Sequence, residues 1–420
     1  MDRRDFNRGL GAAALAAVAG EPVLGAGRKM RDVVYNSVGN TLTHWELDVE
    51  RAALIERGSL VLPSVVQYGW PHPSQPCLYV ATTDSERGAK GITGSGHFLF
   101  ALRPDGAGDL MRHGEPQRLR QRPINVSVDR GGRFILCAYN APGHVSVHRI
   151  EPDGMVGPEI VQPDELDVGV FTHQILATPS NRAVIVPSRG NNPSPGKPKG
   201  DPGAIKLFHF ANGHLSNWAS IEVGGDHGYG YGPRHLDFHP NKPWLYVLVE
   251  LQNQLHMHRL SGDMPSAQPA YAIPCTKAPM VPGVVQVAGA IHVHPKGNVV
   301  YASNRVSATT SPVGAFPFTA GENNIAVFAI DQTTGEPRPI QFADPHGFHV
   351  RAFTIDPSGK VLIAACLAAM SEVKDGEETV TPAGLSLFRI AEDGTLTFAN
   401  RYDIELEPGV QQMWVRAMRV

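Results

Sequence analysis

Polar and charged residues that could carry out chemistry recur beside the ends of short apolar segments in this sequence. The set consists of Asn125, His173, Arg189, Arg234, His235, Glu250, His292, Arg305 and Arg351. An arginine guanidinium stays cationic and can fix a carboxylate, a phosphate or a developing oxyanion. A histidine or glutamate beside it could take a proton from water. The set therefore permits binding of an anionic group together with proton transfer, provided that the fold gathers these residues.

The elements that must gather them are short strands with alternating apolar and polar residues. Such segments recur seven times, at intervals of about 57 residues: 42–47, 97–102, 145–150, 205–210, 255–260, 325–330 and 385–390. Alternation of this kind predicts half-buried β-strands. Repetition at a fixed interval indicates one supersecondary unit used many times.

A second recurring unit lies upstream of most of these strands. It reads as an apolar strand, a tight turn with Pro or Gly, and another apolar strand, at 125–137, 235–247, 292–301 and 352–363, with a weaker copy at 174–186. Pro and Gly supply the backbone angles of a tight hairpin. Four antiparallel strands repeated seven times predict an all-β, seven-bladed β-propeller. We expect the unpaired segment 412–416 to fill the innermost place of the first blade and close the ring.

We expect the candidate functional residues to lie together at one end of this propeller, which we call its mouth. The start of each first strand and the end of each second strand lie side by side there, so the polar set named above shares one rim. The long insertions 83–96, 190–203, 306–321 and 369–383 fall in the following loops and rise over the same mouth. Loops on a rigid scaffold commonly carry binding and catalysis.

Several of these motifs resemble those of a known family. Gly232-Pro-Arg-His-Leu-Asp-Phe-His-Pro-Asn241, with 291–305, 353–365 and 413–415 following in order, is similar to the seven-bladed lactonase family, which contains bacterial 6-phosphogluconolactonases and fungal carboxymuconate cyclases. The resemblance covers about residues 31–420. It implies a lactone-hydrolysing enzyme that acts on a small sugar-derived or carboxylated lactone at the mouth.

The resemblance also implies which residues work. His173, Arg234, Glu250 and Arg305 match the family's functional positions, and we expect them to be catalytic. We favour His173 as the proton-transfer group and Glu250 as an orienter or base, with a plain Arg234–Glu250 salt bridge as the structural alternative. We expect the remaining members of the set, Asn125, Arg189, His235, His292 and Arg351, to bind substrate. Many bacterial relatives carry a histidine where this chain has Asn125.

Two other functions remain open on the same fold. One is a muconate-type cycloisomerase, which closes a lactone instead of opening it. The other is a non-catalytic periplasmic binding propeller.

Charge and composition argue against several partners. The 37 Lys and Arg residues nearly balance 40 Asp and Glu, for a formal net charge of −3, so we expect no nucleic-acid and no membrane partner. The four cysteines are far apart in the sequence and form no C-x-x-C pair; we expect four buried free thiols, although the number permits two disulfides. The pairs His256/His258 and His292/His294 each share a strand face. Because neither has a further ligand at a recognisable spacing, we predict no metal and no cofactor.

The first 27 residues predict an export signal. Arg3-Arg4 and Phe6 precede a mildly apolar Ala/Gly stretch and then small residues, as in a twin-arginine (Tat) signal. We therefore predict residues 1–27 to be a signal that engages the Tat export machinery, residues 28–420 to be one propeller domain, and the protein to be periplasmic.

Overall fold

The protein is described from a computed structural model. It describes residues 30–85, 96–224, 226–281, 284–306, 316–318, 320–374 and 377–420. The chain divides into two compact units, Met1–Met30 and Arg31–Val420, and all but one of the described residues belong to the second. The predicted signal, residues 1–27, lies outside the described residues. Across the described ranges, no helix is long and apolar enough to cross a membrane.

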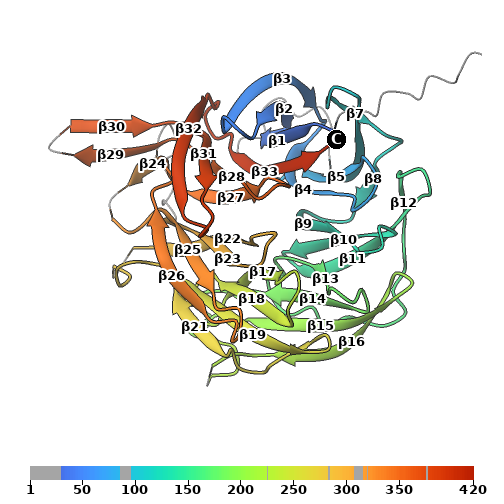
Figure 1. Ribbon diagram of the computed structural model, residues 1–420. Helices are drawn as coiled ribbons and strands as arrows, with labels where there is room; N and C mark the ends of the chain where they lie inside the picture. The colour runs from blue at the N-terminus through green and yellow to red at the C-terminus, as the bar shows by residue number, and fades with distance from the viewer. Residues whose placement is uncertain are drawn as a thin grey trace, which may run out of the picture. The chain divides into compact units, whose positions relative to one another are not determined.

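The second unit is a ring of seven antiparallel blades, as predicted (Figure 1). In order from the innermost strand outward, blade 1 is β33 (Gln412–Arg419), β1 (Asp32–Val38), β2 (Thr41–Asp48) and β3 (Ala53–Val61); blade 2 is β4 (Val65–Pro71), β5 (Leu78–Thr83), β6 (His97–Pro104) and β7 (Leu110–Arg112), with β8 (Gln117–Leu119) also on β6; blade 3 is β9 (Pro123–Val128), β10 (Phe134–Asn140), β11 (Gly143–Ile150) and β12 (Val156–Glu159).

The remaining blades follow the same order. Blade 4 is β13 (Leu176–Ala177), β14 (Ala183–Ser188), β15 (Ala204–Ala211) and β16 (His214–Ile221); blade 5 is β17 (Pro233–Phe238), β18 (Trp244–Val249), β19 (Gln254–Ser261) and β20 (Met264–Pro265), with β21 (Tyr271–Pro274) also on β19; blade 6 is β22 (Gln286–Val293), β23 (Val299–Val306), β25 (Asn324–Ile330) and β26 (Pro337–Ala343); blade 7 is β27 (Val350–Ile355), β28 (Val361–Cys366), β31 (Ala383–Ile390) and β32 (Leu396–Ile404).

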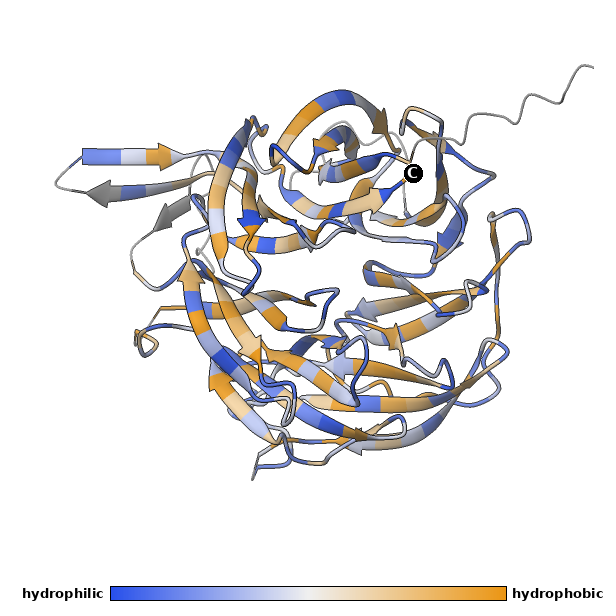
Figure 2. Ribbon diagram, in the orientation of Figure 1, coloured by the Kyte–Doolittle hydropathy of each residue, from blue (hydrophilic) through white to orange (hydrophobic). Residues whose placement is uncertain are grey.

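The predicted repeat matches these strands closely. All seven alternating segments form the third strand of a blade, and the predicted strand pairs form the first and second strands. Second strands such as β10 and β18 are almost wholly buried between neighbouring blades, whereas fourth strands such as β3 have many exposed residues. Apolar and polar residues accordingly interleave along the ribbons (Figure 2). The core is thus a series of inter-blade layers.

An accessory sheet outside the blades was not predicted. β24 (Phe316–Phe318) pairs in parallel with β29 (Met370–Lys374), which pairs in turn with β30 (Glu377–Thr381). These strands come from two of the predicted insertions, in blades 6 and 7. Neither insertion shows an alternating pattern that would have indicated the pairing.

The C-terminal strand closes the ring, as predicted. β33 pairs along its length with β1, from Asp32 opposite Arg419 to Val38 opposite Gln412. The Gln412 amide donates to the carbonyl oxygens of Cys366 and Gly384 in blade 7, and its oxygen accepts from Asn36 in blade 1. The last strand therefore belongs to blade 1 while it holds blade 7.

Tyrosine hydroxyls join neighbouring blades at four interfaces. Each lies on a second strand and donates to a glycine carbonyl in the turn between the third and fourth strands of the next blade. The pairs are Tyr35 with Gly108 (2.6 Å), Tyr79 with Gly154 (2.9 Å), Tyr246 with Gly335 (2.9 Å) and Tyr301 with Gly394 (2.8 Å). A buried hydrogen bond of this kind contributes about 1 kcal/mol net.

Several histidines have a similar structural use. The Nε2 atoms of His72, His239 and His294 each donate to a glycine carbonyl in the turn between the first and second strands of the next blade. The sequence analysis also considered His256 and His258 as a pair on one strand face. His256 forms a hydrogen bond with the side chain of Gln254, and His258 forms one with the carbonyl of Ser266. The four cysteines, Cys77, Cys137, Cys275 and Cys366, are free and buried, as expected.

Removing residues 411–420 should abolish cooperative unfolding, because β1 would become an unpaired inner edge and blade 7 would lose its link to blade 1. Differential scanning calorimetry would measure this. The Trp414→Ala variant keeps the strand but empties a buried site, so it should melt earlier in a single transition. A truncated protein that melts like the full chain would show that closure is unimportant.

Candidate active site

Glu250 stands at the centre of the mouth, directly after β18. Its backbone N–H donates to the Gly232 carbonyl at 2.7 Å, which ties it to the start of β17. Gly232 has φ +70°, and a Cβ there would lie 2.4 Å from Cγ of Leu251. Only glycine meets both conditions without displacing a neighbour. The Gly-Pro-Arg-His motif thus begins with the residue that brings β17 against Glu250.

Three guanidinium groups from three blades surround the Glu250 carboxylate. Arg305 Nη2 donates to Oε1 at 2.7 Å, and Arg189 Nη1 donates to Oε2 at 3.2 Å. Arg234 Nε lies 3.5 Å from Oε1 as an ion pair. The carboxylate and the Arg234 side chain are almost completely buried. The predicted Arg234–Glu250 pair is therefore part of a larger cluster.

Bulges in the innermost strands aim the arginines. In six of the seven innermost strands, one extra residue interrupts the pairing with the second strand of the same blade, at a similar position along the strand. The extra residue of β17 is Arg234, and that of β27 is Arg351. A bulge redirects its extra side chain. Both arginines consequently line one narrow cavity on the propeller axis together with His173, His235 and His292.

Arg234 is fixed by further contacts. Its Nη1 donates to the carbonyl of Gly289 and, at 3.3 Å, to Nδ1 of His235. A Cβ at Gly289 would lie 2.3 Å from Ser303 Oγ, so the backbone approach requires glycine. Arg189 lies over the Phe171 ring, with its Cζ 3.9 Å from the ring centroid. Each guanidinium is thus held from two sides.

The two central histidines are neutral at pH 7. The rings of His173 and His235 meet edge to face, with centroids 5.0 Å apart. Burial, followed by the positive charge of Arg234, holds the pKa of both imidazoles well below 6.5. Among the described residues, His173 Nδ1 has no hydrogen-bond partner. A buried neutral imidazole with a free nitrogen can accept or donate a proton.

Glu250 is ionised. Burial acts to raise its pKa, but the opposing charges of Arg234, Arg305 and Arg189 outweigh burial and bring the pKa below 4.5. Burial and nearby Arg305 lower the pKa of Arg351 to about 9, so this group stays cationic at neutral pH. The cluster therefore contains four guanidinium groups and one carboxylate, and its excess positive charge favours an anionic ligand or oxyanion.

His349 was missed by the sequence analysis. Its Nδ1 donates to the Val306 carbonyl at 3.0 Å, and its Nε2 accepts from Arg305 Nη1 at 3.0 Å. These partners set the tautomer, because a carbonyl can only accept and a guanidinium can only donate. Burial and Arg305 hold the pKa of His349 well below 6.5. Its place two residues before Arg351, where a blade begins, was the available signal.

The structure distributes the remaining predicted residues along the channel. Asn125 is buried, and its oxygen accepts from the Ile175 N–H at 3.4 Å. His292 also lines a deeper cavity of about 240 Å³, where its Nδ1 lies 3.9 Å from Asp237 Oδ2. Arg416, which sequence analysis missed, lines both cavities from β33. The structure therefore brings two groups of predicted residues together: Arg189, Arg234 and Arg305 contact Glu250, and His173, His235 and Arg351 line the axial cavity with Arg234.

The sequence matches a family of known enzymes. The model of the family described as "Lactonase, 7-bladed beta-propeller" matches residues 33–371. The 6-phosphogluconolactonase of an Enterobacter species is 30% identical over 327 residues, covering 76% of this chain and 83% of the relative; that of Pectobacterium atrosepticum is 28% identical over 342 residues, covering 80% and 88%. The chain therefore belongs to the seven-bladed β-propeller lactonase family.

A solved structure has the same fold. The periplasmic gluconolactonase of Pseudomonas aeruginosa superposes with a TM-score of 0.67 at 16% identity, covering 91% of this chain and 99% of that chain. Family membership and the curated relatives make this protein a lactonase-type hydrolase, that is, an enzyme that opens cyclic esters.

Replacing Glu250 by glutamine should lower the free energy of unfolding by about 3 to 5 kcal/mol at pH 7, because buried guanidinium groups would lose their counter-charge. Since the folded-state pKa of Glu250 is lowered, the wild type has this stabilisation above pH 4.5 and loses it as the pH falls through the folded-state value. The deficit of E250Q should therefore shrink on acidification.

Urea unfolding between pH 7 and the lowest pH at which the wild type stays folded would measure this. The matched control is Glu50→Gln, which removes an exposed pair with Lys360 and should change stability far less. A pH-independent deficit in E250Q would mean that packing, not charge, is responsible.

Proposed function

We propose that this protein hydrolyses a sugar-derived or related carboxylated lactone at the mouth of the propeller, with His173, Arg234, Glu250 and Arg305 as its working residues. The observation that carries the proposal is the buried cluster of cationic groups around one ionised carboxylate, beside a neutral histidine. Ester hydrolysis needs an activated water and a stabilised oxyanion, and these groups can supply both.

His173 acts as the proton-transfer group in this proposal. As water attacks the lactone carbonyl carbon, its proton passes to the imidazole, and the carbonyl oxygen becomes an oxyanion. The ring C–O bond then breaks, and His173 returns the proton to the leaving alkoxide. The products are a hydroxyl group and a carboxylic acid, which releases its proton to solvent and becomes a carboxylate, so the enzyme ends in its starting state.

Arg234 and Arg305 stabilise the oxyanion and the carboxylate product, while Arg189, Arg351, His235, His292 and Asn125 shape substrate binding. Glu250 has both oxygens engaged by guanidinium groups. This favours its role as an orienter over that of a base. Its negative charge compensates part of the positive charge and fixes the direction of each guanidinium.

We propose a non-phosphorylated sugar lactone as substrate and a place in carbohydrate metabolism. The Tat-type pattern of residues 1–27 supports export, and phosphorylated metabolites are poor candidates outside the cytoplasm. The periplasmic gluconolactonase of Pseudomonas aeruginosa gives a precedent on this fold. The comparisons give no support to the cycloisomerase or the binding-only alternative over hydrolysis.

The wild type should accelerate acid release from a panel of lactones, including glucono-δ-lactone and 6-phosphogluconolactone, measured by pH-stat against spontaneous hydrolysis. We expect the unphosphorylated sugar lactones to be preferred. The value of kcat/KM should stay level from pH 8 to below 6.5, because the pKa of His173 lies well below 6.5. His173→Asn should lower kcat by about 10²- to 10⁴-fold and Arg234→Lys by about 10²- to 10³-fold.

Arg338→Ala, which alters an exposed arginine on β26, is the control and should keep full activity. Wild-type turnover in both site variants would clear His173 and Arg234 of these roles. Turnover of 6-phosphogluconolactone alone would contradict the unphosphorylated substrate.

Fusing residues 1–30 to a reporter should export the reporter across the inner membrane, because the segment contains the twin arginine and the apolar stretch that the Tat machinery reads. Fractionation would locate the reporter. Arg3→Lys together with Arg4→Lys should keep it in the cytoplasm. A wild-type fusion that stays cytoplasmic would end the proposal of export.

A further inference from the structure

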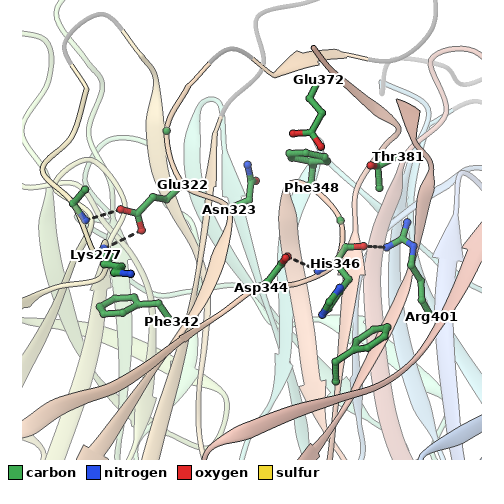
Figure 3. Close-up of a pocket in the computed structure, with 14 residues that line it drawn as sticks. Lys277, Glu322, Asn323, Phe342, Asp344, His346, Phe348, Glu372, Thr381 and Arg401 are labelled. Atoms are coloured by element: carbon green, nitrogen blue, oxygen red, sulfur yellow. Dashed lines mark hydrogen bonds between the residues drawn. The ribbon is translucent and has the colours of Figure 1, made fainter. Parts of the chain in front are cut away.

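A third cavity, of about 980 Å³, lies beside the mouth where blades 6 and 7 meet the accessory sheet (Figure 3). Its volume is at the upper end of the range for ligand pockets. Phe342, Phe348 and Phe398 contribute aromatic surface, while Glu372 and Thr381 reach it from β29 and β30. None of the predicted site residues lines this cavity.

One short segment separates this cavity from the catalytic cluster. His346 lines the cavity and His349 contacts Arg305, and both have left-handed backbones, with φ of 51° and 56°. Such conformations cost of order 1 kcal/mol or more in a residue other than glycine. The His349 N–H donates to Asn323 Oδ1 at 2.9 Å, and Asn323 lines the cavity. A single residue therefore touches both sites.

Contacts from three other residues hold the left-handed turn at His346. Asp344 Oδ1 accepts the His346 N–H at 2.8 Å, Arg401 Nη1 donates to the His346 carbonyl, and the imidazole lies 3.8 Å from the Phe398 ring, between centroids. Figure 3 shows both polar contacts converging on this residue. The wall of the cavity is thus held rigid, which reduces the entropy that a ligand must overcome.

The free polar groups of the cavity suit a neutral ligand with many hydroxyls. Glu322 is occupied by the backbone N–H groups of Lys277 and Ala278, and Arg401 by carbonyls and Asp403. Within the described ranges, the Lys277 ammonium and the Glu372 carboxylate line the cavity and form no hydrogen bond or ion pair. Carboxylates accept hydroxyl hydrogen bonds, an ammonium donates them, and aromatic rings cover apolar C–H faces.

Charge distinguishes the two sites. The mouth has four guanidinium groups and one carboxylate, whereas the cavity offers one free carboxylate, Glu372, beside one free ammonium, Lys277. A lactone end that becomes a carboxylate is favoured at the mouth, and an uncharged polyhydroxyl group is favoured in the cavity.

We propose that this cavity is a saccharide subsite and that the substrate is an aldonolactone carrying a glycosyl unit, with the lactone ring at the mouth and the glycosyl unit in the cavity. This inference rests on the proposed lactone hydrolysis. It extends that hydrolysis from a monosaccharide lactone to the lactone of an oxidised disaccharide.

The test compares kcat/KM for glucono-δ-lactone with that for the aldonolactones of maltose and cellobiose. The wild type should prefer at least one disaccharide lactone by 10-fold or more. Glu372→Ala and Phe398→Ala should bring this ratio close to one and leave the rate on glucono-δ-lactone unchanged. Glu378→Ala is the matched control, since this exposed residue of β30 does not line the cavity, and it should keep the preference.

Equal kcat/KM on all three lactones, or a preference that survives both cavity variants, would overturn the subsite. Hydrolysis of the monosaccharide lactone alone would do the same while leaving the proposed function intact. If no lactone is hydrolysed, the proposed function fails, and calorimetric titration with maltose and cellobiose decides the subsite. Binding that Glu372→Ala weakens at least 5-fold supports it, and no binding to the wild type refutes it.

Discussion

The pairing of β33 with β1 is the constraint on which the rest of the structure depends. A propeller has a defined axial channel only when its ring is closed, and here the last eight-residue strand of the chain closes it. The same strand takes part in the site: Arg351 donates to the Met413 carbonyl at 3.1 Å, and Arg416 lines the channel. Closure of the ring therefore also determines part of the site geometry, because β33 completes blade 1 and at the same time places side-chain and backbone groups between blades 7 and 2.

Ring geometry explains how so much positive charge is tolerated in a buried place. Each blade presents one residue at the mouth level of its inner strand, and bulges aim several of them at the axis. Burial of like charges is unfavourable, and a single carboxylate, Glu250, compensates three of them directly. Burial, reinforced by the remaining positive charge, holds the pKa values of the nearby imidazoles well below 6.5 and keeps them neutral. Tyrosine and histidine hydrogen bonds that repeat at the blade interfaces stabilise the ring around this cluster.

The fold could be predicted from the sequence because its signals are local and repeated. Alternating segments, hairpin turns and an unpaired last strand indicated seven blades and their closure. The position of Arg234, Glu250 and Arg305 at the mouth followed from their places at strand ends. An Arg234–Glu250 pair was also considered, but the convergence of Arg189 and Arg305 on the same carboxylate was not predicted, because contacts between different blades leave no mark in the sequence pattern. The accessory sheet could not be predicted from the sequence either, since β24 and β29 come from distant insertions and pair in parallel.

The segment 346–349 shows why the finer parts of a site escape sequence reasoning. Its two left-handed histidines are stable only because groups from other elements hold them: Asp344 and Arg401 at His346, and Asn323 with Val306 at His349. Strain that surrounding structure over-determines is typical of functional positions. Here it lets four consecutive residues face an apolar, weakly acidic cavity at one end and a strongly cationic cluster at the other. A segment that only connected blade 6 to blade 7 would not require this change, from an apolar cavity to a cationic cluster, within four residues.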